Sequence, residues 1–190
     1  MTFGRGVLVG VAVLVAAGLA WLLFAGLPRW YDRTPKRADA GAPAEAPAPG
    51  RKIKARLLYV GEEGTRLTSV ERDVAFGETT TDQARSIIEA QIAPAAEPLV
   101  SAVPAGTMLR TLFVTETGEA FVDLTHEVAT NHTGGSTNEA LTVYTIVNAL
   151  TANLPAVTSV QLLIDGKQVD TLAGHIDLRR PLGKNLAWVQ

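Results

Sequence analysis

The chain has no cysteine among its 190 residues. Disulfide bonds and a lipid-modified cysteine are therefore excluded within this sequence, and the folded part must be stabilised by its core. Basic residues are also too few to dominate the surface: residues 51–190 carry twelve Lys and Arg against sixteen Asp and Glu, a net charge of −4. Because phosphate backbones bind to basic surfaces, we do not expect nucleic acid as a partner.

Charged residues are absent from Gly6 to Leu27, which reads GVLVGVAVLVAAGLAWLLFAGL. A helix of about 20 apolar residues spans a bilayer, so this segment predicts a single transmembrane helix, preceded by a tail over residues 1–5. No small-x-small cleavage site follows the apolar run, which favours an uncleaved signal anchor over a cleaved signal peptide. We therefore expect the chain to be attached to a membrane as a single-pass protein.

Residues 28–50 combine an aromatic pair, Trp30 and Tyr31, with an Ala/Pro-rich stretch from Pro35 to Gly50. Aromatic side chains suit the membrane interface, whereas the Ala/Pro stretch has too little apolar bulk to form a core. These features predict a juxtamembrane segment and linker over residues 28–50, followed by one folded domain over residues 51–190.

The first half of the domain alternates strand and helix patterns. Strands are predicted over 55–60 and, more weakly, over 66–74, and a hairpin is predicted around the turn at Thr117 and Gly118. Between them, a threonine of residues 79–81 can cap a helix whose first turn holds Asp82. That helix has one apolar face with i, i+3, i+4, i+8 spacing, formed by Ala84, Ile87, Ile88 and Ile92.

The second half begins with a helix and ends with a hairpin. Ser136 and Glu139 have the S-x-x-E spacing of a capping box. An apolar stripe of Val143, Val147, Leu150 and Leu154 is expected to face a sheet, and Pro155 ends the helix. A strand over 160–164, an Asp165-Gly166 turn and a return strand over 167–172 follow. This order of elements predicts an α+β fold with two helices packed on one face of a largely antiparallel sheet.

Three segments carry a resemblance to a known family: SAVPAGT from Ser101, GSTNEALTVYTIVNALT from Gly135, and LLIDGKQVDTLAGHIDL from Leu162. Over about Ala55 to Leu182 the chain resembles the GerMN domain, named after the germination and sporulation protein GerM. The resemblance implies a fold similar to ring-building motifs, a role in sporulation or germination, and a domain on the extracytoplasmic side of the bacterial cytoplasmic membrane. It implies no catalytic residue.

The basic residues around the apolar segment conflict with that orientation. Arg5 precedes the segment, whereas Arg29, Arg33, Lys36 and Arg37 follow it. The positive-inside rule alone would place the domain in the cytoplasm. The leading tail is only five residues long, so we follow the resemblance and expect the domain outside.

Two kinds of enzyme site can be assembled from the residue types present. Ser101, His175 and Asp177 could form a hydrolase triad, but no G-x-S-x-G elbow is present. A metal could be bound by Asp123, His126, Glu127 and His132, but their spacing matches no recognised site, and a polar run between a strand and a helix is usually a solvated loop. We therefore expect no enzymatic activity, no metal and no cofactor.

The residues that folding does not explain form the candidate interaction surface: Tyr144, Asn148, Gly174, His175 and Asp177. Tyr144 and Asn148 are i and i+4 on one helix, where Tyr144 could also simply pack at the core margin. Gly174 suggests a turn with His175 as its hydrogen-bonding partner. The favoured function is a non-catalytic protein-interaction or assembly module of the cell envelope, binding an envelope protein or a second copy. The alternatives are a module that binds cell-wall glycan or a small ligand, and a hydrolase or metal enzyme.

Overall fold

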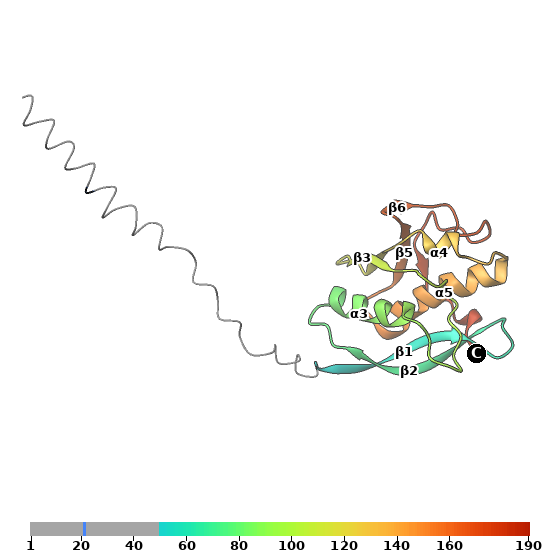
Figure 1. The fold of residues 1–190 in the computed structure, drawn as a ribbon, viewed down its shortest axis with the longest axis horizontal. Helices are drawn as coiled ribbons and strands as arrows, with labels where there is room; N and C mark the ends of the chain where they lie inside the picture. The colour runs from blue at the N-terminus through green and yellow to red at the C-terminus, as the bar shows by residue number, and fades with distance from the viewer. Residues whose placement is uncertain (1–20, 22–49) are drawn as a thin grey trace, which may run out of the picture. The chain divides into compact units, whose positions relative to one another are not determined.

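The computed structural model describes residue 21 and residues 50–190. In the domain formed by residues 50–190, helices α3 (Thr80–Ile92) and α5 (Ser136–Asn153) lie between a two-stranded sheet and a five-stranded sheet (Figure 1). The α+β class predicted from the sequence is confirmed. The predicted single sheet is wrong, because the strands form two sheets and the helices are covered on two sides.

The predicted membrane segment, Gly6 to Leu27, lies outside the described residues except for Trp21, which is helical. The predicted tail and the linker up to residue 49 also lie outside them. Among the helices that the structure describes, none has both the length and the apolar character needed to cross a bilayer. The anchor therefore stays a prediction from the sequence.

The first sheet is an antiparallel hairpin of β1 (Lys52–Val60) and β2 (Leu67–Ala75). The weakly patterned second strand is therefore present, although only Leu67 and Val74 are buried in it. Alternate residues of β1, namely Ala55, Leu57 and Tyr59, are buried in the main core. The pairing with β1, rather than the pattern of β2 itself, thus places β2 in the sheet.

Side-chain amides from the two helices pair with the outer backbone edge of β1. Leu58 donates its N–H to Gln91 Oε1 at 2.8 Å and accepts from Gln91 Nε2 at 2.7 Å. Arg56 makes the same two contacts with Asn153, both at 2.8 Å. Both backbone groups of each residue are therefore paired, so this edge of β1 is closed by the two helices.

Helix α3 begins as its sequence predicts. Thr79 is the N-cap, its hydroxyl accepts from the N–H of Asp82 at 3.1 Å, and the Asp82 carboxylate accepts from the N–H of Thr79 at 3.3 Å. This reciprocal pair is a capping box, which satisfies two backbone donors of the first turn. Of the predicted apolar face, Ala84, Ile87 and Ile88 are buried, which confirms that face.

The second sheet has the strand order β3-β4-β5-β6, and β7 also pairs with β5. The bounds are β3 (Leu109–Val114), β4 (Glu119–Leu124), β5 (Ser159–Ile164), β6 (Lys167–Gln168) and β7 (Leu182–Gly183). Both predicted hairpins are present, but β4 and β5 are parallel. Parallel neighbours need a long crossover, and α5 provides it.

Helix α5 is buried well beyond the predicted stripe. The stripe residues Val143, Val147 and Leu150 are buried, and so are the polar residues Thr142, Thr145, Asn148 and Thr151. A helix covered by two sheets has no broad solvent face, so its polar residues are inside, and some of them bond with carbonyl groups of the helix itself. The hydroxyl of Thr151, for example, donates to the carbonyl of Val147 at 2.8 Å.

The chain leaves the second sheet earlier than predicted. The return strand expected over 167–172 is only the two-residue β6, after which the chain forms an irregular segment with Leu172 and Leu178 buried. The C-terminus continues through β7 to the 3₁₀ helix η2 (Leu186–Trp188). A short helix, α4 (Glu127–Thr130), stands in the polar run before α5.

Candidate functional site

The carboxylate of Glu139 lies in the first turn of α5 and is fully buried. Its Oε1 accepts from the N–H of Leu172 at 2.9 Å, and its Oε2 accepts from the N–H of His175 at 2.8 Å. The predicted capping box is wrong: the N-cap is Gly135, with φ 87°, and no side chain caps the helix. Glu139 instead holds the loop from Leu172 to His175 against α5.

The hydrogen bonds determine the charge of Glu139. Burial raises the pKa of its carboxyl, but the backbone N–H groups of Ala173, Ile176, His175 and Leu172 together outweigh burial and hold this pKa below its ordinary value. Glu139 is therefore an ionised, buried acceptor at neutral pH. Its surroundings suit the anchoring of a loop and leave no solvent-accessible carboxylate for a reaction.

Gly174 and His175 lie in the loop that Glu139 holds. Gly174 has φ 97°, a region that favours glycine, and its N–H donates to the Thr171 hydroxyl at 2.9 Å. The predicted turn is confirmed, whereas His175 is not the partner of Gly174. The His175 ring contacts Glu139 through Nδ1 at 3.1 Å and is 44% exposed.

Asp177 lies on the surface beside the same loop. It accepts from Nε and Nη2 of Arg179 at 2.9 and 2.8 Å, and from the Arg179 N–H at 3.0 Å. The hydrogen bonds and charge of Arg179 hold the pKa of Asp177 below its ordinary value, and the same contact raises the pKa of Arg179. Both side chains are more than half exposed, so this ion pair contributes little stability.

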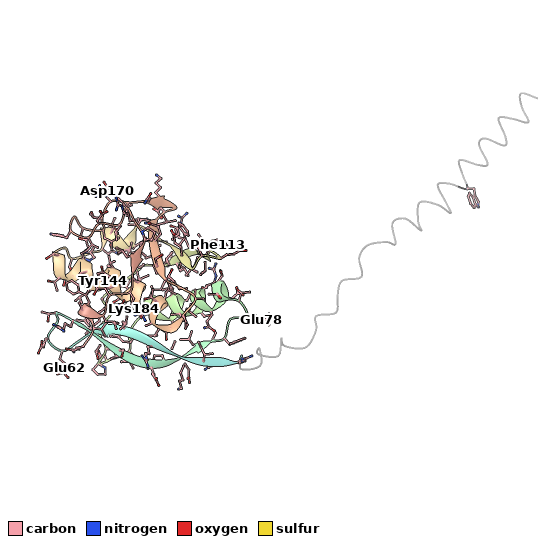
Figure 2. The ribbon with its side chains drawn as sticks, turned by 180° about the vertical axis from the view of Figure 1, so that it is seen from behind. Glu62, Glu78, Phe113, Tyr144, Asp170 and Lys184 are labelled. Atoms are coloured by element: carbon pink, nitrogen blue, oxygen red, sulfur yellow. The ribbon has the colours of Figure 1, made fainter. Side chains whose placement is uncertain are left out.

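Tyr144 and Asn148 contact the C-terminal segment rather than the 174–177 loop. The Asn148 amide donates to the carbonyl of Asn185 at 2.8 Å and accepts from its N–H at 2.9 Å. Tyr144 stacks on Trp188 of η2 with ring centroids 6.2 Å apart, and Figure 2 shows Tyr144 beside the C-terminal segment that carries Lys184. Asn148 is only 1% exposed, so it lies inside the domain and not on an interaction surface.

The three residues of the possible hydrolase triad have separate partners. The hydroxyl of Ser101 contacts the backbone of its neighbour Val103. His175 bonds with Glu139, and Asp177 bonds with Arg179. Among the hydrogen bonds of residues 50–190, none joins a nucleophile, a base and an orienting acid from this set, so the arrangement that nucleophilic catalysis requires is not formed there.

The four possible metal ligands are likewise divided. Asp123 is buried and bonds with Arg110 at 2.9 Å and with the N–H of Gly166 at 2.7 Å. His126 lies 3.4 Å from Glu127. Within residues 21 and 50–190, no three His, Asp or Glu side chains are placed to bind one metal ion.

His132, the fourth of those residues, is part of a network that positions two loops. Gly134 donates its N–H to His132 Nδ1 at 2.9 Å, so Nε2 carries the proton and donates to the Thr142 hydroxyl at 3.2 Å. That hydroxyl in turn donates to the carbonyl of Ala102 at 2.6 Å. The network holds the segment around Ala102 against α5 and forms one wall of a groove.

This groove has a volume of about 870 Å³ and is the site that sequence reasoning missed. Its walls come from residues 92–95 and 99–108, from residues 131–133 with Asn138, and from Leu141 and Thr142 of α5, with Val60 and Gly64 at its margin. The lining includes the whole SAVPAGT segment, which in the sequence is notable only as one of the segments that carry the family resemblance. The signal in the sequence that could have indicated the groove is this run of mostly small residues, which lies between the two predicted helices.

The chemistry of the groove is uncharged. Among its described lining residues there is no Asp, Glu, Lys or Arg, and no Phe, Tyr or Trp. Val100 and Met108 are 58% and 61% exposed within it. The groove is therefore an apolar, uncharged concavity whose polar groups, such as His132 and Thr142, already bond with one another.

One family model and two solved structures are similar to this chain. The family model described as "Germane: Sporulation and spore germination" matches residues 56–170. Among solved structures, the tandem GerMN domains of the sporulation protein GerM from Bacillus subtilis match with a TM-score of 0.51 and 16% identity, over 72% of this chain and 46% of that one. The chain therefore spans under half the length of that protein.

A second solved structure, a candidate lipoprotein from Clostridium perfringens, matches with a TM-score of 0.50 and 20% identity, over 70% of this chain and 88% of that one. At these identities the two structures show that the fold is shared. A search of the curated proteins finds no match.

Proposed function

Because the chain belongs to the Germane family of sporulation and spore germination proteins, we propose that its domain is a non-catalytic protein-interaction module of the bacterial cell envelope. The uncharged groove between residues 92–108 and the start of α5 carries this proposal. It exposes the side chains of Val100 and Met108, which water solvates poorly and a partner would cover. Its occupant would be an uncharged, apolar segment of a partner protein.

The hydrogen bonds of the potentially reactive side chains support a non-catalytic function. Ser101, Glu139, His175 and Asp177 each bond with a neighbour that is not part of a shared reaction centre. Glu139, the buried ionised carboxylate, accepts from the backbone N–H groups of Leu172 and His175, so it stabilises the loop and is not available to a substrate.

The proposed location is the outer side of the cytoplasmic membrane. The apolar segment from Gly6 to Leu27 would anchor the chain, since no cysteine is available for a lipid. The C. perfringens structure is described as a candidate lipoprotein, which is consistent with a membrane-attached domain of this fold. A signal anchor would provide the same attachment here without lipidation.

The second candidate function, binding of cell-wall glycan, is less well supported by the groove. Sugar rings commonly stack on aromatic side chains, and no Phe, Tyr or Trp is among the described lining residues. Co-sedimentation of the full-length protein with purified peptidoglycan tests this alternative. Pelleting at moderate salt that is lost in Met108→Glu would favour glycan binding over the proposal.

The main test places a photo-crosslinking amino acid at Met108 of the full-length protein in its own cells. The matched control is the same amino acid at Phe113, which points out from β3 (Figure 2) and is 59% exposed but does not line the groove. We expect a discrete protein adduct from position 108, absent from position 113, that disappears when Val100→Glu is added. Equal adducts from both positions, or adducts that persist with Val100→Glu, would contradict the proposal. The mass of the adduct distinguishes an envelope partner from a second copy.

A further inference from the structure

The β1–β2 hairpin lies at the lower border of the domain in Figure 1, and its two outer edges differ in whether their backbone groups have hydrogen-bond partners. The contacts of Arg56 and Leu58 with Asn153 and Gln91 show that the N–H and C=O groups of these β1 residues point away from β2. In an antiparallel pair, the backbone N–H and C=O groups of two directly opposite residues either all point between the strands or all point away from them. The backbone groups of the residues opposite Arg56 and Leu58 must therefore also point away from the partner strand, on the other side of the hairpin.

Those opposite residues define the open edge of β2: Glu71 pairs with Arg56, Ser69 pairs with Leu58, and Asp73 follows in the same alternation. In the hydrogen bonds of residues 50–190, no partner contacts the outward backbone groups of Ser69, Glu71 and Asp73. At Leu67 the edge is occupied, because its carbonyl accepts from the N–H of Gln190 at 2.9 Å. The open stretch thus runs from Ser69 to Asp73.

Charges on the hairpin indicate what would fit this edge. Directly opposite residues of a sheet share a face, so Glu71 and Asp73 lie on the same face as Arg56 and Lys54, their partners on β1. Lys54 Nζ contacts Asp73 Oδ1 at 2.7 Å, and both side chains are more than half exposed. Strand β1 therefore already shows how a strand with basic residues two positions apart is accommodated beside β2.

We propose that the open edge of β2 binds an extended segment of a partner protein that carries Lys or Arg at alternating positions. The segment would pair with the outward backbone groups of Ser69, Glu71 and Asp73, as in β-strand addition. Its basic side chains would lie beside Glu71 and Asp73, opposite the basic row of β1. A second copy of β2 fits poorly, because the register that overlaps the whole stretch puts Glu71 opposite Glu71. This surface is separate from the groove, and either can fail without the other.

The probe is a nine-residue peptide of alternating Thr and Lys, titrated against the full-length protein in mild detergent and followed by fluorescence anisotropy. Two peptides of related composition serve as controls: one with the same residues arranged in a Lys block and a Thr block, and one with Glu in place of Lys. We expect the alternating Lys peptide to bind at least about tenfold more tightly than either control, because only it presents its charges at the spacing of the acidic row.

Two sets of variants separate backbone pairing from charge. Ser69→Pro removes an outward N–H without removing a bond to β1, whereas Ser69→Ala keeps that N–H. We expect about tenfold weaker binding for Ser69→Pro and unchanged binding for Ser69→Ala. The double variant Glu71→Lys/Asp73→Lys should lose the Lys peptide and gain the Glu peptide, which a misfolded protein would not do.

Equal binding of the block and alternating peptides would overturn the proposal, since it would show attraction by charge alone. Unchanged binding to Ser69→Pro, with native circular dichroism, would overturn it as well, because backbone pairing would then be absent. Failure of all three peptides to bind at low salt would have the same consequence. Loss of crosslinking at Met108 would bear on the groove and leave this surface unaffected.

Discussion

Replacing Glu139 by Gln should destabilise the domain and release the loop that follows β6. The carboxylate accepts from two backbone N–H groups, those of Leu172 and His175, through different oxygens. An amide in the same place offers one oxygen and one NH₂ group, so one backbone donor faces another donor. A buried donor without a partner costs about 1–3 kcal/mol, partly offset because a buried charge is removed.

The expected net loss is therefore smaller than that cost, about 0.5–2 kcal/mol, or roughly 2–8 °C in Tm for a domain of this size. Urea denaturation of the full-length protein measures the free energy of unfolding, and hydrogen exchange identifies the amides of Leu172 and His175 as the first to lose protection. His175→Ala is the matched control, because it removes only a half-exposed ring and keeps the backbone N–H. Its cost should stay below about 1 kcal/mol.

The pH dependence provides a second check. The folded-state pKa of Glu139 lies below the unfolded value of about 4.3. The carboxylate therefore contributes its full stabilisation above the unfolded pKa and loses it as pH falls through the folded pKa. The difference in unfolding free energy between the wild type and Glu139→Gln should shrink below about pH 4. Equal stability at pH 7, or a difference independent of pH down to the folded pKa, would refute the role given to this carboxylate.

Two further contacts can be tested in the same way. Gln91→Leu leaves both backbone groups of the buried Leu58 without partners, so urea denaturation should show a loss of about 2–4 kcal/mol; a loss below about 0.5 kcal/mol would mean that water replaces the amide. Asn148→Leu removes both contacts to Asn185, and hydrogen exchange of residues 185–190 should accelerate by about tenfold or more. Unchanged exchange there would show that the Tyr144–Trp188 stack and the contact of Gln190 with Leu67 are enough to hold the C-terminus.

The local elements of the fold could be predicted because their signals are short-range. The Thr79 cap, the apolar face of α3 and the Asp165-Gly166 turn each depend on residues within a few positions of one another. The capping box expected at Ser136 shows where such reasoning stops. Ser136 and Glu139 have the spacing of a capping box, yet the carboxylate of Glu139 bonds with residues 33 and 36 positions away. No local pattern reveals these partners.

The five residues chosen from sequence show the same limit. Gly174 is exposed in the loop that Glu139 holds and Asp177 is exposed beside it, whereas Asn148 is buried against the C-terminal segment. Polar residues on a helix indicate either a surface or an internal hydrogen bond, and the sequence of α5 cannot distinguish them. The groove and the open edge of β2 were missed because the groove joins residues 92–108 to α5 and the edge depends on how β2 pairs with β1, and no local pattern reveals either arrangement.

By itself the sequence determined the composition limits, the cysteine-free core, the apolar segment from Gly6 to Leu27, the α+β class and the family. These follow from composition and from patterns within single elements. Only the tertiary structure decided that the strands form two sheets, that α5 is buried between them, and which edge of the first hairpin is open. Those features depend on pairings between distant residues, whose free energies are set by burial and by the satisfaction of backbone groups rather than by neighbouring side chains.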